Sequence, residues 1–225
     1  MVGSGLLVVD AHGREPLPSA PAAPPARVRP SAVSTTTTTA APGDREAFVV
    51  GDSLTVGTEP WLDRALQVRG WDLSGVDARV GRGVDEGLAV LRKEGATLPD
   101  TVVIALGTNN PGAGASTVRN WLRSARRIAG KRRVVWVNTC IADKEARPLA
   151  ASRRLNAALA QYADWYGVEL ADWCTFAADR DITPRADGVH YDTAGYKIRA
   201  RFYALALAGK IPQPRSAPVR TAAQQ

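Results

Sequence analysis

The chain has 225 residues, which is enough for one well-buried domain with additional tails. Its composition, 45% hydrophobic and 23% charged residues, is ordinary for a soluble globular protein. No apolar run approaches the roughly 20 residues that a membrane-spanning helix needs. The net charge of +7 comes from scattered arginines without interleaved aromatic residues. We therefore expect no nucleic-acid partner, although this charge is compatible with a mild attraction to acidic cell-surface polymers.

The first 44 residues differ from the rest in composition, because prolines punctuate alanines, arginines and a run of threonines at 35–39. Such a segment buries too little apolar surface to offset its ordering entropy, so we predict a disordered linker over 1–44. A catalytic-size domain is expected over 45–210, followed by a disordered tail over 211–225. A Pro/Thr-rich spacer is typical of tethered extracytoplasmic domains. The apolar run within residues 1–10 is too short for a signal sequence. Export is therefore a hypothesis, which requires these residues to be the remainder of a longer signal or membrane anchor.

Short apolar runs alternate with helical patterns through the domain. Five runs predict strands: Ala47–Val50, Val76–Val80, Thr101–Leu106, Arg133–Val137 and Val168–Ala171. The helical patterns cover Pro60–Gln67, Asp85–Lys93, Leu149–Tyr166, Thr193–Leu207 and a face formed by Val118, Trp121, Leu122, Ala125 and Ile128. This alternation predicts an α/β fold, a three-layer sandwich around a five-stranded parallel sheet with right-handed crossovers.

Ligand chemistry in such sheets lies at the carboxyl ends of the strands. Four polar segments fall there: Gly51-Asp52-Ser53, Gly81-Arg82-Gly83, Gly107-Thr108-Asn109-Asn110 and Asp187-Gly188-Val189-His190. We therefore expect all four to meet at one edge of the sheet.

His190 is the domain's only histidine, since His12 falls in the linker. A lone histidine is more often structural than catalytic. Asp187 precedes it by three residues, however, and can face it on a single turn, which would orient the imidazole and stabilise its charged form.

Ser53 has two interpretations, as the N-cap of the following helix or as a nucleophile beside a histidine base. The Gly81 amide and the Asn109 side chain offer hydrogen-bond donors for an oxyanion. Gly81 can equally belong to a tight turn, and Asn109 can equally form an Asx-turn before Pro111. The glycines around Arg82 have the wrong spacing and strand position for a dinucleotide motif, and the chain lacks a P-loop, so we expect no nucleotide cofactor.

Together these four blocks resemble the SGNH superfamily, also called GDSL-type esterases and lipases, from about Phe48 to Tyr196. The resemblance implies a flavodoxin-like fold, with Ser53 as nucleophile, His190 as general base and acid, and Asp187 orienting it. It also implies an oxyanion hole formed by the Ser53 and Gly81 amides and the Asn109 side chain, with Gly83 as a competitor for Gly81.

Within the superfamily, the chain looks similar to extracytoplasmic domains that add or remove O-acetyl groups on cell-wall glycans, often beside a membrane acyltransferase partner. We expect a monomeric esterase acting on small acyl esters or acetylated glycans, without metal or cofactor. An O-acetyltransferase is the second hypothesis. A non-catalytic glycan-binding module, with Trp61 as a candidate substrate contact and Trp121 as packing, is the third.

Two cysteines are too few for a disulfide framework and lack the spacing of a zinc site. Cys140 follows the fourth predicted strand and Cys174 the fifth, so neighbouring parallel strands would bring them to the same edge. Either a disulfide, given export, or two free thiols is compatible with this placement.

Overall fold

The computed structural model describes residues 45–110, 112–142 and 149–211. The expectations for 1–44 and for most of the tail lie outside these residues. Ile211, which was assigned to the tail, is 9% exposed and packs in the core. The folded part therefore extends at least one residue beyond the predicted boundary.

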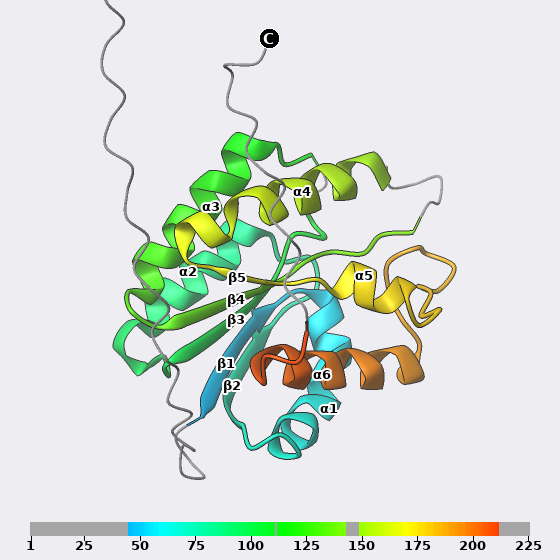
Figure 1. Cartoon of the computed structure of the whole chain (residues 1–225), viewed down its shortest axis with the longest axis horizontal. Helices are drawn as coiled ribbons and strands as arrows, with labels where there is room; N and C mark the ends of the chain where they lie inside the picture. The colour runs from blue at the N-terminus through cyan, green and yellow to red at the C-terminus, as the bar shows by residue number, and fades with distance from the viewer. Residues whose placement is uncertain (1–44, 111, 143–148, 212–225) are drawn as a thin grey trace, which may run out of the picture. The chain divides into compact units, whose positions relative to one another are not determined.

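Five parallel strands form one sheet in the order β2-β1-β3-β4-β5. They are β1 (Glu46–Gly51), β2 (Asp72–Ala78), β3 (Thr101–Ala105), β4 (Arg133–Val137) and β5 (Glu169–Ala171). β2 lies on one side of β1, and β3, β4 and β5 follow one another on its other side (Figure 1). This parallel sheet between helices is the predicted α/β fold.

Helices cover both faces of the sheet. They are α1 (Ser53–Gln67), α2 (Val84–Glu94), α3 (Ala115–Ala129), α4 (Leu149–Tyr162), α5 (Trp173–Ala178) and α6 (Thr193–Leu207), with short 3₁₀ turns η1 (Gly95–Thr97) and η2 (Asp164–Tyr166). The buried residues of α1, α5 and α6 form one core cluster, and those of α2, α3 and α4 form the other.

Alternation along the strands explains why both faces are apolar. In β3, Val103 contributes to the α1/α6 core, whereas Val102 and Ile104 contribute to the α2/α3/α4 core. All five residues of this central strand are buried. Such strands read as continuous apolar runs, which is why β3 and β4 were predicted closely.

Several predicted boundaries were wrong. Helix α4 ends at Tyr162, and Tyr166, which was expected to end it, lies in η2. β2 begins at Asp72 and ends at Ala78, and Val80, which was expected to end it, is 72% exposed. An edge strand pairs on one side only, so its sequence is partly polar and gives a weak signal. Helix α1 begins seven residues before Pro60, which lies exposed inside it. The six-residue α5 was not predicted, because it is too short to show helical periodicity.

Within the described residues, no helix is both long and apolar enough to cross a membrane.

Candidate active site

Ser53 is the first residue of α1, directly after the loop residue Asp52 that follows β1. Asp52 is the helix N-cap, and its Oδ1 accepts a hydrogen bond from the Leu54 amide at 3.0 Å. The interpretation of Ser53 as the cap was therefore wrong, because the preceding aspartate takes that role. Ser53 Oγ is left to bond elsewhere.

A hydrogen-bonded chain joins Ser53, His190 and Asp187. Ser53 Oγ lies 2.9 Å from His190 Nε2, and His190 Nδ1 lies 2.8 Å from Asp187 Oδ2. The other carboxylate oxygen, Asp187 Oδ1, accepts the backbone amides of Val189 at 2.8 Å and His190 at 2.9 Å. The turn from 187 to 190 thus fixes the carboxylate and the imidazole together.

Electrostatics favour an ionised Asp187. Hydrogen bonds from the backbone amides of His190 and Val189, followed by the His190 side chain, lower the pKa of Asp187 to about 2. An ionised carboxylate accepts a hydrogen bond from the Nδ1–H group, which leaves the Nε2 lone pair facing the Ser53 hydroxyl. This is the arrangement in which a histidine can remove the proton of a serine hydroxyl.

Two buried ionisable side chains, Asp52 and Arg199, interact electrostatically without forming an ion pair among the described residues. Burial raises the pKa of Asp52, and this rise is opposed by Arg199, by the Leu54 amide and by the Thr108 side chain. Arg199 from α6 is only 2% exposed, and its guanidinium lies 5.0 Å from the ring centroid of Trp173. Sequence reasoning missed this arginine, because nothing in the pattern of α6 distinguishes a buried arginine from an exposed one.

The glycines after β2 have different roles. Gly81 has φ +76° and is exposed, and its amide has no acceptor among the described residues. The Gly83 amide donates to Glu86 Oε2 at 2.9 Å, as part of the cap of α2. An amide that is already bonded is not free to stabilise a developing charge, so the geometry favours Gly81 over Gly83.

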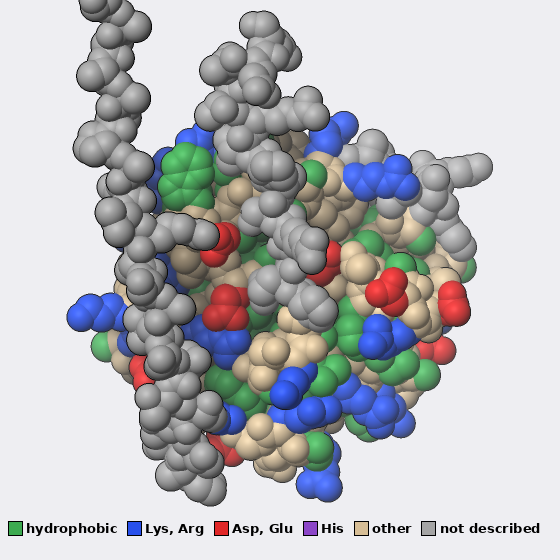
Figure 2. Space-filling view, viewed as in Figure 1, with side chains coloured by type: hydrophobic (Ala, Val, Ile, Leu, Met, Phe, Trp, Pro, Cys, Tyr) green, Lys and Arg blue, Asp and Glu red, His purple; other side chains and the backbone are tan. Residues whose placement is uncertain are grey.

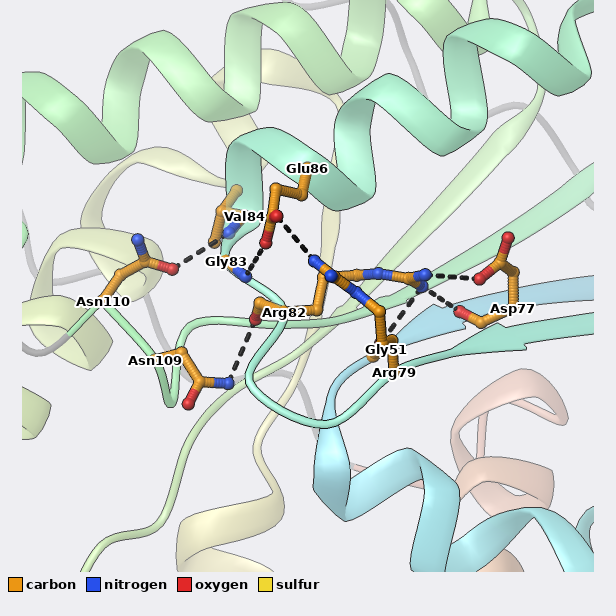
Figure 3. Close-up of polar contacts among 9 residues, drawn as sticks. All are labelled: Gly51, Asp77, Arg79, Arg82, Gly83, Val84, Glu86, Asn109 and Asn110. Carbon is orange, nitrogen blue, oxygen red and sulfur yellow. Dashed lines mark hydrogen bonds and ion pairs between the residues drawn. The ribbon is translucent and has the colours of Figure 1, made fainter.

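Arg82, between these glycines, anchors the loop (Figure 3). Its Nη1 donates to the carbonyls of Asp77 and Gly51, and its Nη2 pairs with the Asp77 carboxylate. The Asn109 Nδ2 donates in turn to the Arg82 carbonyl at 3.1 Å. This bond uses one amide hydrogen and orients the Asn109 side chain, while the second hydrogen remains as a donor.

Asn110 ties the same two loops together from the other side. Its side-chain Oδ1 accepts a hydrogen bond from the Val84 backbone amide, at the start of α2, at 2.9 Å. Its backbone amide donates to the Gly107 carbonyl at 3.0 Å. The backbone thus turns here, and the side chain that bonds the first turn of α2 is that of Asn110. Sequence reasoning missed both Arg82 and Asn110, and the one available signal was an arginine between two glycines at a strand end.

Cys140 and Cys174 form a disulfide. It joins the segments that follow β4 and β5, which pair in the sheet. Asn138 reinforces this link, because its Nδ2 donates to Asp172 Oδ1 at 2.8 Å and its Oδ1 accepts the Cys174 amide at 3.1 Å. Of the two alternatives for the cysteines, the structure contains the disulfide.

Solved structures with the same fold include two enzymes that handle acetyl groups. The C-terminal catalytic domain of Streptococcus pneumoniae peptidoglycan O-acetyltransferase A is 24% identical, with a TM-score of 0.60 over 75% of this chain and 97% of that one. An acetyl xylan esterase from Geobacillus stearothermophilus is 17% identical, with a TM-score of 0.59 over 75% of this chain and 96% of that one. At these identities the likeness shows the fold.

No curated protein sequence matches this chain significantly. A family model does match, and it is described as the GDSL-like lipase/acylhydrolase family and covers residues 49–198. That range contains all four polar segments, three that follow strands and the fourth, at 187–190, that precedes α6. The chain therefore belongs to the GDSL-like lipase/acylhydrolase family, as its motifs predicted.

Proposed function

We propose that the protein is a serine esterase that removes short acyl groups, with O-acetyl as the first choice, from an alcohol or a glycan. The observation that carries this proposal is the chain of hydrogen bonds from Ser53 through His190 to Asp187, at 2.9 and 2.8 Å. Family membership supports acyl hydrolysis or transfer, and the geometry supports the serine as the reacting group.

In this mechanism Ser53 Oγ attacks the ester carbonyl carbon while His190 Nε2 takes its proton. The negative oxygen of the tetrahedral intermediate accepts hydrogen bonds from the Ser53 and Gly81 amides and from the second hydrogen of the Asn109 amide. His190 then protonates the leaving alcohol, and an acyl-serine remains. Water, deprotonated by His190, attacks the acyl-serine and releases the carboxylic acid.

Hydrolysis is the preferred outcome because the candidate residues are open to water. The side chains of His190 and Asp187 are 38% and 51% exposed, and Ser53 is half-buried. A transferase must keep water from its acyl-enzyme while the acceptor binds. Transfer of the acyl group to a glycan hydroxyl is therefore the alternative outcome of the test below.

A fluorophosphonate probe, followed by peptide mass spectrometry, tests the nucleophile. We expect a single adduct on Ser53 and none in Ser53→Ala. An unlabelled wild-type protein that still binds glycans would replace the enzyme with a non-catalytic binding module.

A series of aryl esters from acetyl to long acyl chains then tests the acyl group. We expect acetyl to be hydrolysed fastest. Product analysis with acetylated xylan, alone and with a free glycan acceptor, separates the two reactions, because free acetate indicates hydrolysis and a newly acetylated acceptor indicates transfer.

We also propose that the protein works outside the cytoplasm. The Cys140–Cys174 disulfide supports this, since such bonds persist in oxidising compartments. Alkylation of unreduced protein from its native compartment should find both cysteines blocked, and two free thiols would contradict the proposal.

A further inference from the structure

A groove outside the candidate active site lies between α1 and α6, with a volume of about 550 Å³. Four cationic side chains line it, Arg64 from the end of α1, Arg69 from the turn after it, and Lys197 and Arg201 from α6. All four are exposed, and none forms an ion pair within the residues that the structure describes. Figure 2 shows Lys and Arg side chains gathered over the part of the surface where Figure 1 draws these helices.

The lining between these charges is apolar. Trp61 stands at one end with the Lys197 ammonium 4.4 Å from its ring centroid, and Ala65, Ala204 and Leu205 contribute carbon surface. Cations held beside an aromatic ring and aliphatic walls suit a ligand whose negative charges alternate with uncharged carbon segments.

Helix dipoles do not explain all four cations. A cation near a helix C-terminus is stabilised by the dipole, which accounts for Arg64 in the last turn of α1. Lys197 and Arg201 lie in the interior of α6, whose last turn carries no basic residue. The acidic residue Asp63 of α1 is not part of the groove, and its carboxylate accepts a hydrogen bond from Gln67 at 2.9 Å. The groove is therefore a cluster of uncompensated positive charge.

The cations of the groove are spread along two helices rather than gathered around one point. Both helices begin at the candidate active site, where Ser53 starts α1 and His190 precedes α6 by three residues. Trp61 lies eight residues along α1 from Ser53, or about 12 Å at the rise of an α-helix. Lys197 and Arg201 are one turn apart, about 6 Å along the axis. A polymer repeat of six backbone bonds spans about 7 Å when extended, so successive charges of such a chain match this spacing.

We propose that this groove binds a phosphodiester-linked polyol polymer, an extended chain with one negative charge per repeat. A guanidinium group can bind two oxygens of one phosphate through parallel hydrogen bonds. The apolar lining of the groove accommodates the carbon segments between the phosphates. A second copy of this chain would bring further positive charge, given the net charge of +7. The segment at 212–225 contains two arginines and no acidic residue, so it does not complement the groove either.

Binding of poly(glycerol phosphate) of about ten repeats, measured by isothermal titration over a range of salt concentrations, tests the proposal. The double variant Arg64→Gln/Arg201→Gln should weaken binding about tenfold or more and reduce the slope of log K against log salt by about 1 to 2. Arg92→Gln/Lys93→Gln on α2 is the matched control, because it removes the same charge from exposed positions outside the groove and should leave affinity nearly unchanged.

Two further ligands distinguish the occupant. A single-stranded oligothymidylate with the same number of phosphates and vesicles containing anionic phospholipid should both bind more weakly than the polyol polymer. Tryptophan fluorescence of the wild type should change when the polymer binds, and this change should be absent in Trp61→Phe. The proposal would be overturned if the polymer did not bind, or if the α2 control lost as much affinity as the double variant. It would also be overturned if the oligonucleotide or the vesicles bound more tightly than the polymer. Hydrolysis of a small aryl acetate should be unchanged in the double variant, so this test is independent of the chemistry proposed for Ser53.

Discussion

The base and the hydrogen-bond donors of the candidate active site are oriented over very different sequence distances. In the half that contains Ser53 and His190, the imidazole and its partner Asp187 are only three residues apart and substantially exposed, although the bond from this turn to Ser53 spans 137 positions. In the donor half, the bonds that position Gly81 and Asn109 join residues 26 to 31 positions apart. A short turn can thus orient a base, whereas hydrogen-bond donors need two loops fixed against each other.

Each half also contains one buried arginine, and the two are compensated differently. Arg82 donates to two carbonyls and a carboxylate. Arg199 lies against the rings of Trp173 and Tyr203 and offsets the charge of Asp52. The first arginine fixes a loop and the second balances a charge, so removing them should give different defects.

The largest effect is expected in the half with the short turn, from Ser53→Ala. Loss of a serine nucleophile should lower kcat for an aryl acetate about a millionfold. Steady-state kinetics measures this, with circular dichroism as the control for folding. Retention of wild-type rates would remove Ser53 from the mechanism.

Asp187→Asn should lower kcat about 10⁴-fold, because the amide holds His190 in the wrong tautomer. The variant also tests the lowered pKa of Asp187. A carboxylate whose pKa falls from 3.8 to about 2 on folding stabilises the protein above pH 3.8, and this contribution is lost as the pH falls through 2. Acid unfolding should therefore show a smaller pH dependence between 4 and 2 in the variant than in wild type, and equal curves would contradict the shift.

In the donor half, Asn109→Ala should lower kcat about 10² to 10³-fold with little change in KM, since its amide acts on charge that develops only in the transition state. Asn110→Ala is the matched control. It removes the acceptor of the Val84 amide at the start of α2 and should cost about 1 kcal/mol in the free energy of unfolding, measured in urea, while kcat changes little. If Asn110→Ala lowered kcat more than Asn109→Ala does, Asn110 rather than Asn109 would be the oxyanion donor.

Arg199→Met should lower the free energy of unfolding by about 2 kcal/mol at pH 7, because it removes a positive charge that favours the ionised form of the buried Asp52. The pKa of Asp52 is already raised above 3.8, so the penalty should shrink as the pH falls toward that value and the group protonates. Exposed Arg201→Met on the same helix should change stability by less than about 0.5 kcal/mol. A pH-independent loss would mean that the packing of Arg199, not its charge, is what matters.

The smallest effect is expected from Arg82→Gln, at about a tenfold loss in kcat, since it loosens the loop that positions two donors without touching substrate. Labelling of Ser53 by a fluorophosphonate should persist, because the bonds that join Ser53, His190 and Asp187 do not involve Arg82, which reaches only the Gly51 carbonyl before Ser53. Exposed Arg79→Gln is the control and should leave kcat nearly unchanged. If Arg82→Gln abolished labelling as well, the two halves would not be independent.

Much of the fold could be predicted from sequence, because buried parallel strands read as apolar runs. β4 and α6 have the predicted bounds, and the SGNH fold class is confirmed. The edge strand β2 and the start of α1 could not be predicted as well. A one-sided strand needs few apolar residues, and Pro60 in an exposed helix interior looks like a helix start.

The sequence by itself determined which reactive groups exist and in what order, since a single histidine follows an aspartate by three residues and a serine follows the first strand. Only the tertiary structure decided that Asp52 rather than Ser53 caps α1, that the Gly83 amide is occupied, and that Arg82 and Arg199 are buried. The reason is physical: local patterns record the geometry of one turn or one strand, whereas the burial of a charge depends on partners that the fold brings from distant segments.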